Sequence, residues 1–255
     1  IRLYNYKSMD RIRWVIVDNH PNSTHSAEII SFLGWLGGGH QYIPLESPVG
    51  TSAPRQMVFE AAQTEWVMCV DSHIFLAPGS LEALLNYIDT HPQSNDLLSG
   101  PILKDDLTVM ATHFQDIWNA DMWGVWGLDQ RGLDPTNKPF EIPAMGLGLF
   151  CCRKEMWTKV GGFNKKFRGF GGEEFYIHKK FYRAGAKCLC LPAVKWWHDF
   201  HKGGGIPYKH AASTWNNARN YVIGHDELNL PFDNIMRMFV PNRVPMHEWL
   251  YLIQT

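Results

Sequence analysis

Short apolar runs alternate with amphipathic stretches along the first third of the chain. The apolar runs have the length and the β-branched content of buried strands, which are predicted over 12–17, 40–45 and 66–70. The stretches with a helical period predict helices over about 23–36, 51–63 and 78–90. Strands and helices in this alternation are typical of an α/β fold with a mostly parallel sheet and helices on both of its faces.

The pattern loses its regularity in the middle of the chain. Residues 116–143 contain three tryptophans and several glycines without a clear period, and we expect a long excursion there with short helical pieces. Further strands are predicted over 96–103, 107–114, 144–152, 187–191 and 193–197, and further helices over 153–160, 173–184 and 208–223. Prolines near the end indicate a tail, so we divide the chain into a domain over 1–224 and a C-terminal extension over 225–255 that packs on it.

Composition and charge place the chain among ordinary globular proteins. Hydrophobic residues make up 45% of the 255 residues and charged residues 19%, and the formal net charge of −1 does not indicate a polyanionic partner. No apolar run approaches the roughly 20 residues that cross a bilayer. The five cysteines lie in apolar runs without the spacing of a zinc or redox site. We therefore expect buried free thiols, a reducing compartment and a cytoplasmic location.

The strand over 66–70 is followed by Asp71-Ser72-His73, which places an acid and an imidazole at its carboxyl end. Ligands of such sheets bind beyond the carboxyl ends of the strands, and Asp18 lies at the end of the first strand in the same way. Side chains alternate along an extended segment, so Asp71 and His73 are expected to point the same way and to ligate one ion. A carboxylate with an imidazole suits Mn²⁺ or Zn²⁺ better than Ca²⁺.

Two further clusters strengthen this interpretation. The last apolar run ends near two histidines, of which His198 is the candidate third ligand and His201 the competing choice. Between the clusters, residues 169–174 read GFGGEE, and the glycines allow the backbone to approach a ligand closely. Glu173 and Glu174 open a predicted helix, where the helix dipole favours negative charge. They either serve only the helix start, or one acid orients a substrate hydroxyl while the other accepts a proton.

Four segments, taken in order, resemble nucleotide-sugar glycosyltransferases of the GT-A fold, over roughly Ile12 to His201. The stretch Val160–His198 is similar to the family-2 pattern of GGF, an acidic pair, a helix ending in RAG, and a strand ending in histidine. VIVDNHPNS resembles that family's second strand with its base-contacting aspartate, and residues 50–73 resemble the segment that carries an arginine, a helix and a metal-binding D-x-D motif. Here D-S-H replaces D-x-D, as in polypeptide N-acetylgalactosaminyltransferases, which AMGLGLFCCRKEMW followed by GFGGEE also resembles.

The resemblance implies a function and a set of site residues. The chain is expected to move a hexose or an N-acetylhexosamine from a UDP-sugar to a hydroxyl acceptor. A divalent metal, Mn²⁺ with Mg²⁺ as the alternative, is expected on Asp71, His73 and His198, where it would neutralise charge on the leaving nucleotide. Asp18 is expected to contact the uracil, and Arg55 the nucleotide or its phosphates. The resemblance also assigns donor-binding roles to Asp71, Ser72, Gly146, Gly148 and Gly172.

The reaction type depends on Glu173 and Glu174, the two catalytic residues that the resemblance implies. Glu174 occupies the place where family 2 has a catalytic aspartate and the N-acetylgalactosaminyl family has asparagine. A carboxylate there favours an inverting displacement, in which a base removes the acceptor proton, whereas D-S-H is the motif of the retaining family. We therefore expect inversion, with retention as the alternative, and a contact of Glu173 with the sugar or the acceptor. A catalytically inactive module that binds sugars or nucleotides is the alternative function.

The acceptor is expected to meet two parts of the chain. Aromatic side chains in the tryptophan-rich segment 116–143 would stack on a sugar or a base. The segment 153–187 has 10 basic and 3 acidic residues, and Lys165, Lys166 and Arg168 lie just before the acidic pair. The candidate acceptors are a peptide serine or threonine, a glycan, and a hydroxylated nucleic-acid base, the last of which would use this positive charge.

GT-A domains open with a strand that helps to bind the base, and a helix follows it. Ile1–Lys7 (IRLYNYK) resembles the end of that helix, and the predicted strand over 12–17 resembles the second strand. We therefore expect that this sequence lacks the first strand of the fold.

Overall fold

A computed structural model describes residues 9–21, 23–47, 49–119, 122–199, 214–239, 247–248 and 251. The expectations for Ile1–Lys7 and for His201 lie outside these described residues. The strands and helices predicted in the first third of the chain are present, after a short 3₁₀ turn, η1 (Met9–Arg11). Its strands are β1 (Val15–Asp18), β2 (Gln41–Pro44) and β3 (Trp66–Val70), and its helices are α1 (Ser26–Leu36), α2 (Ser52–Ala61) and α3 (Ser80–Thr90).

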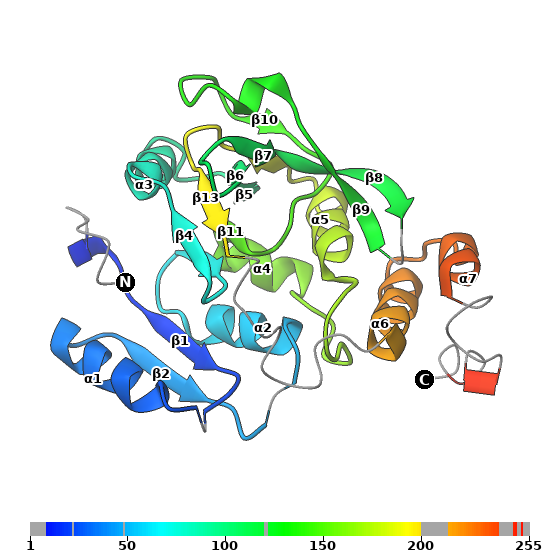
Figure 1. Ribbon diagram of the computed structural model, residues 1–255, viewed down its shortest axis with the longest axis horizontal. Coiled ribbons are helices and arrows are strands. Elements are labelled where there is room, and N and C mark those ends of the chain that lie inside the picture. Colours follow the sequence, from blue (N-terminus) through cyan, green and yellow to red (C-terminus); the bar gives the residue numbers. More distant parts are fainter. Residues whose placement is uncertain are drawn as a thin grey trace.

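The fourth strand, β4 (Ile74–Leu76), was not predicted, because three residues between a turn and a proline carry no periodic signal. The later strands are β5 (Leu97–Ser99), β6 (Ile102–Leu103), β7 (Val109–Ala111), β8 (His113–Asn119), β9 (Met122–Gly127), β10 (Phe140–Glu141), β11 (Leu149–Arg153), β12 (Cys188–Cys190) and β13 (Trp196–His198). The later helices are η2 (Gln130–Gly132), α4 (Lys154–Val160), α5 (Glu173–Arg183), α6 (Thr214–Glu227) and α7 (Asp233–Phe239). In Figure 1, β1, β2 and α1 lie at one end of the molecule and α6 and α7 at the other.

The α/β class is confirmed, but the strands of the described residues are mixed in direction rather than mostly parallel. β1 pairs in parallel with β2. In the five-stranded sheet β10-β12-β5-β11-β3, β12 and β5 run parallel, whereas β11 runs antiparallel to both β5 and β3. In the four-stranded sheet β4-β13-β6-β7, β13 runs parallel to β6 and antiparallel to β4. Parallel neighbours need a long crossover, and the chain after β6 instead turns back through the antiparallel pairs β6–β7 and β8–β9.

The first part of the segment 116–143 lies in a β-hairpin rather than in an irregular excursion, and one short helical piece, η2, follows it. β8 pairs antiparallel with β9, and Trp118 stacks on Trp123 with 5.5 Å between ring centroids. Trp123 is 7% exposed whereas Trp126 is 39% exposed, so aromatic residues lie on both faces of β9. A register shift also interrupts the pairing between Gln115 and Trp118. Both features obscure the two-residue period by which a strand is predicted.

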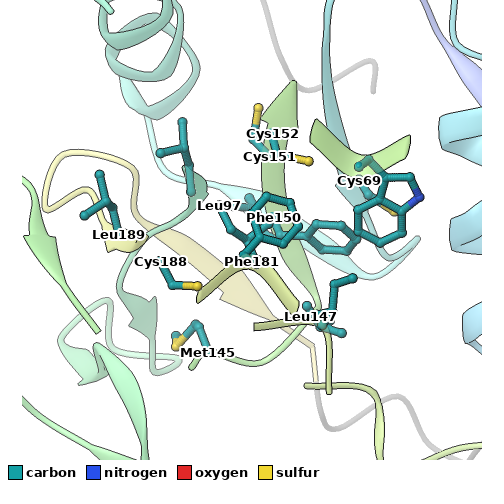
Figure 2. Packing of buried hydrophobic residues seen from close by; sticks show 14 of the residues in the cluster. Cys69, Leu97, Met145, Leu147, Phe150, Cys151, Cys152, Phe181, Cys188 and Leu189 are labelled. Atoms are coloured by element: carbon teal, nitrogen blue, oxygen red, sulfur yellow. The ribbon is translucent and has the colours of Figure 1, made fainter. Parts of the chain in front are cut away.

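The main hydrophobic core joins the five-stranded sheet to helices α2, α3, α4 and α5. Figure 2 shows Phe150 and Phe181 packed together near its centre, with cysteine side chains around them. All five cysteines are buried and free, as predicted. Burial raises the pKa of Cys69 to about 12, so this thiol stays protonated and behaves as a small apolar group.

Trp157→Ala is expected to lower the free energy of unfolding by about 3–5 kcal/mol, because Trp157 is 2% exposed and its ring stacks on Phe59 at 4.0 Å between centroids. Trp35→Ala is the control. Trp35 is 78% exposed on α1, and its replacement is expected to change that free energy by about 0.5 kcal/mol or less. Urea unfolding followed by circular dichroism measures both variants. Equal losses for the two variants would contradict the packing described around α4.

Helices α6 and α7 form a second hydrophobic cluster with the β8–β9 hairpin. Ile235 and Phe239 on α7 are fully buried in this cluster, together with Tyr221 on α6 and Phe175 on α5. Helix α6 continues to Glu227, past the expected boundary at residue 224, so the division into a domain and an extension stays a prediction. None of the helices in the described residues is long and apolar enough to cross a bilayer.

Candidate functional site

The turn that joins β3 to β4 brings two of the expected metal ligands together. Asp71 follows β3, and the backbone N–H of Ile74 donates to the carbonyl of Asp71 over 3.2 Å, which closes a turn through Ser72 and His73. The expectation of an extended segment here was therefore wrong. The side chains of Asp71 and His73 come to one site because the chain turns there, not because side chains alternate along a strand. The backbone N–H of Asp71 also donates to the carbonyl of Gly148 over 3.0 Å, which ties the turn to the start of β11.

The third expected ligand, His198, comes from the end of β13, 125 positions after His73. β13 pairs antiparallel with β4, and its register sets His198 opposite Ile74. The backbone N–H of Asp199 donates to the carbonyl of His73 over 3.1 Å and continues the pairing into the turn. This register places the two histidines side by side.

The three side chains fit a divalent cation with nitrogen and oxygen ligands. One ligand atom from each of Asp71, His73 and His198 lies within 4.8 Å of the others. The two Nε2 atoms are 2.9 Å apart, and the planes of the imidazole rings meet at 89°. Two ligand atoms at right angles around an ion, each about 2.1 Å from it, are separated by about 3 Å, so both nitrogens can contact one ion. Burial, together with the neighbouring His73, lowers the pKa of His198 to about 4, which keeps this imidazole neutral, as a ligand must be.

Arg55 on α2 fixes the position of the Asp71 carboxylate. Its Nη2 donates to Oδ2 over 2.9 Å and to Oδ1 over 3.0 Å, and its Nε donates to Oδ1 over 3.3 Å. The side chain of Arg55 is 8% exposed, and its Nη1 is buried without a hydrogen-bond partner in the part of the chain that the structure describes. Burial opposes the charge of the guanidinium, but the negative charges of Asp71, Glu173 and Glu174 together outweigh burial and raise the pKa of Arg55. A buried cation therefore stands next to the expected metal site.

Glu173, the first acid of GFGGEE, is fully buried and hydrogen-bonded through both oxygens. Thr51 Oγ1 and Ser52 Oγ donate to Oε1, the latter over 3.1 Å, and the backbone N–H of Gly171 donates to Oε2 over 2.8 Å. The backbone N–H of Thr51 also donates to the carbonyl of Gly169 over 2.9 Å. The exposed fraction of Glu173 is 0%. Its carboxylate therefore joins the start of α2 to the glycine loop, and it does not face the solvent from which a sugar or an acceptor would approach.

Glu174 has different surroundings, although it is the next residue. It is 9% exposed, and its carboxyl interacts electrostatically with Glu173, Arg55 and Asp71. Burial and the charge of Glu173 raise the pKa of Glu174 from 4.5 to about 7, against the opposing charge of Arg55. A carboxyl with a pKa near neutrality is suited to take up and release a proton at physiological pH.

His178, one turn further along α5, connects Glu174 to the segment before β11. Its Nδ1 lies 2.6 Å from the carbonyl of Glu174, and its Nε2 accepts a hydrogen bond from the backbone N–H of Met145 over 3.1 Å. Nδ1 therefore carries the proton, and burial lowers the pKa of His178 to about 4, so the ring stays neutral. No motif in the sequence indicated this contact. The contacts of Thr51 and Ser52 with Glu173 were missed as well, because hydroxyls at the start of a helix are read as caps.

Asp18, at the end of β1, lies in a separate hydrogen-bond network. Its carboxylate accepts hydrogen bonds from Tyr42 Oη over 2.6 Å, the backbone N–H of His20 over 2.8 Å and Ser26 Oγ over 3.0 Å. Burial opposes its ionisation, but these hydrogen bonds outweigh burial and lower the pKa of Asp18. The side chain of Asn19 donates to the carbonyl of Gly50 over 2.9 Å, which links the end of β1 to the start of α2.

The glycines with expected donor-binding roles have different surroundings. At Gly148, an added Cβ would lie 3.0 Å from the side chains of Ile74 and Trp196, so a larger residue there requires these side chains to shift. At Gly146, an added Cβ would lie 3.1 Å from the ring of Trp126. Gly172 has a φ of +88°, a left-handed conformation that favours glycine, directly before α5. Ser72 is exposed in the turn between β3 and β4.

Comparisons with known proteins find relatives over most of the chain. The family described as glycosyl transferase family 2 matches residues 2–152, and the N-terminal domain of galactosyltransferase matches residues 130–202. Polypeptide N-acetylgalactosaminyltransferase 5 of Caenorhabditis elegans is 24% identical over 208 residues, which are 76% of this chain and 32% of that protein. Putative inactive polypeptide N-acetylgalactosaminyltransferase 12 of Drosophila melanogaster is 23% identical over 202 residues, which are 73% of this chain and 35% of that protein. The chain thus spans about a third of the length of these curated relatives.

Among solved structures, the crystal structure of GalNAc-T7 with UDP, GalNAc and Mn²⁺ is similar to this chain with a TM-score of 0.66 and 19% sequence identity. The similarity covers 83% of this chain and 41% of that chain. It confirms the GT-A fold that the sequence motifs implied. Because the family match over residues 2–152 covers more than half of the sequence, the chain belongs to glycosyl transferase family 2.

Proposed function

We propose that this chain is a metal-dependent glycosyltransferase that moves a hexose or an N-acetylhexosamine from a UDP-sugar to a hydroxyl acceptor. One observation carries the proposal. One ligand atom from each of Asp71, His73 and His198 lies within 4.8 Å of the others, and Arg55 forms an ion pair with the Asp71 carboxylate. The relative from Caenorhabditis elegans, which is named a polypeptide N-acetylgalactosaminyltransferase, supports it. The complex of GalNAc-T7 with UDP, GalNAc and Mn²⁺ supports the same classes of donor and ion.

The donor diphosphate is proposed to bind beside Asp71, His73 and His198. Mn²⁺ on these side chains, with Mg²⁺ as the alternative, would neutralise charge on the departing UDP. Arg55 is proposed to keep the Asp71 carboxylate in place and to add positive charge near the phosphates. Asp18 is proposed to contact the uracil, because three hydrogen bonds already fix its carboxylate at the end of β1.

Glu174 is proposed as the base of an inverting displacement. It would take the proton of the acceptor hydroxyl while the acceptor oxygen bonds to the anomeric carbon and the bond from that carbon to the UDP oxygen breaks. The raised pKa of Glu174 supports this role, since the carboxylate is present at neutral pH and still holds a proton well. Glu173 is proposed to position Glu174 without reacting, because its own carboxylate is buried and hydrogen-bonded through both oxygens.

The acceptor is proposed to approach over the β8–β9 hairpin and the basic loop before α5. Trp126 on β9 is 39% exposed, packs on Phe114 with 4.2 Å between ring centroids, and lies next to Gly146. An exposed indole there suits the face of a sugar ring or an apolar peptide side chain, and so favours a glycan or a peptide hydroxyl. Lys165 and Arg168 are exposed before α5, and a hydroxylated nucleic-acid base would make use of their charge.

A catalytically inactive module that binds a nucleotide sugar is the second candidate. One observation favours it: the relative from Drosophila melanogaster is named putative inactive. The two candidates differ in a single measurable property, because a module that only binds leaves the bond between the sugar and UDP intact.

A donor screen tests the proposal. The purified chain is incubated with Mn²⁺ and a panel of UDP- and GDP-sugars, and released nucleotide is measured with and without EDTA. We expect EDTA-sensitive release from a UDP-sugar that peptide, glycan or oligonucleotide acceptors accelerate. Proton NMR of the product then reads its anomeric configuration. Binding of a UDP-sugar without release, in the presence of every acceptor class, would contradict the enzyme and favour the inactive module.

A further inference from the structure

The loop that precedes the acidic pair, residues 168–172, is held by a side chain from helix α6. Asn220 is 0% exposed. Its Oδ1 accepts a hydrogen bond from the backbone N–H of Arg168 over 3.0 Å. Its Nδ2 donates to the carbonyl of Arg168 over 2.8 Å and to the carbonyl of Gly171 over 2.9 Å. One buried amide therefore binds the backbone at both ends of the loop.

The loop also lies too close to α6 for side chains to fit between them. Gly171 and Gly172 have φ values of +102° and +88°, which favour glycine. An added Cβ at Gly172 would lie 3.1 Å from Cβ of Asn220, and one at Gly171 would lie 2.1 Å from Oδ1 of Asn217. The left-handed glycines and the close approach to α6 therefore restrict the conformations that this loop can adopt.

The opposite side of the loop contacts the start of α2. The backbone N–H of Thr51 donates to the carbonyl of Gly169, and Gly171 donates to the carboxylate of Glu173, which Ser52 also contacts. Helix α2 carries Arg55, the partner of the Asp71 carboxylate. The loop is thus fixed between α6 and the helix that positions the expected metal ligand.

We propose that Asn220 is a positioning residue for Glu174, which makes helix α6 part of the catalytic apparatus. The inference rests on the proposed function, in which Glu174 accepts the proton of the acceptor. Asn220 does not touch the reacting atoms, because both its oxygen and its nitrogen are bonded to the loop backbone. It acts through the loop whose last residue, Gly172, directly precedes α5 and its two acids.

Asn220→Ala tests the proposal, because it removes the three hydrogen bonds without adding charge or bulk. We expect kcat to fall about 10- to 100-fold, since a small displacement of a catalytic group has an effect of that size. The Kd for Mn²⁺ is expected to change by less than about threefold, because Asp71, His73 and His198 lie outside the loop. Val222→Ala is the matched control: Val222 also lies on α6, is also buried, and packs in the second hydrophobic cluster with α7 and the β8–β9 hairpin. We expect it to lower the thermal midpoint but to leave kcat nearly unchanged.

Hydrogen–deuterium exchange supplies a readout that does not depend on activity. The amide of Arg168 donates to Asn220, so its exchange is expected to accelerate in Asn220→Ala and not in Val222→Ala. Unchanged exchange in the loop, or a kcat that falls no further than in the control, would overturn the positioning role. An unmodified chain that transfers no sugar would overturn the proposed function, while the exchange of Arg168 would still decide whether Asn220 holds the loop.

Discussion

Asp71→Ala is expected to lower both the Mn²⁺ affinity and the rate of sugar transfer by at least about 100-fold. Asp71 supplies the carboxylate of a cluster whose three ligand atoms lie within 4.8 Å of one another, and the two imidazoles alone give a divalent cation no anionic ligand. The substitution also leaves the guanidinium of Arg55 without its counter-ion. We therefore expect the free energy of unfolding to fall by about 1–3 kcal/mol as well.

Isothermal titration with Mn²⁺ and a released-nucleotide assay measure these effects. Asp71→Asn keeps the shape of the side chain and an oxygen that accepts from Arg55, so it separates the loss of a metal ligand from a loss of stability. Asp89→Asn is the matched control, since Asp89 is exposed and pairs with Arg11 at the surface. A folded Asp71→Asn variant with unchanged Mn²⁺ affinity would exclude this cluster as the metal site.

Glu174→Gln is expected to lower kcat by about 100- to 10,000-fold, because the amide cannot accept the proton of the acceptor hydroxyl. In the unmodified chain, burial and Glu173 raise the pKa of Glu174 to about 7. Below that pH the carboxyl is protonated and cannot act as a base, so kcat is expected to fall about tenfold per pH unit and to level off above it. The glutamine variant is expected to lack this acidic limb. Rates at saturating donor and acceptor, measured between about pH 5 and 9, give both profiles.

Glu173→Gln is the informative comparison for that experiment. It removes the negative charge that helps to raise the pKa of Glu174. Its acidic limb should therefore move to lower pH, and its kcat should fall through the loosened glycine loop rather than through loss of the base. A Glu174→Gln variant with unchanged kcat, together with a product that keeps the anomeric configuration of the donor, would instead identify a retaining reaction.

Where the local pattern is periodic, the sequence was sufficient to place the elements that carry the site. The apolar run before Asp71 is β3 with its predicted bounds, and the helix that begins with Glu173 is α5. The order of the motifs also led to the correct fold and family. The pattern failed at β4, which has three residues, and at β9, where Trp123 and Trp126 occupy both faces.

Contacts between distant segments were beyond sequence reasoning. A hydroxyl at the start of a helix, such as that of Ser52, predicts a cap, yet it contacts Glu173, 121 positions away. Asn220 lies inside a helix, where nothing local indicates that its amide binds a loop. The choice between His198 and His201 was open for the same reason. The structure brings His198 to Asp71 and His73, whereas His201 lies outside the described residues.

The wide separation of these partners along the chain determines when the site comes into being. His73 meets His198 across 125 positions, and Ser52 meets Glu173 across 121. Closing segments of that length costs chain entropy before any contact is gained, so such pairs form late in folding. A fragment that stops before residue 173 contains Asp71 but neither Glu174 nor His198. During synthesis, a ribosome-bound chain therefore holds an incomplete cluster of candidate metal ligands until β13 has emerged.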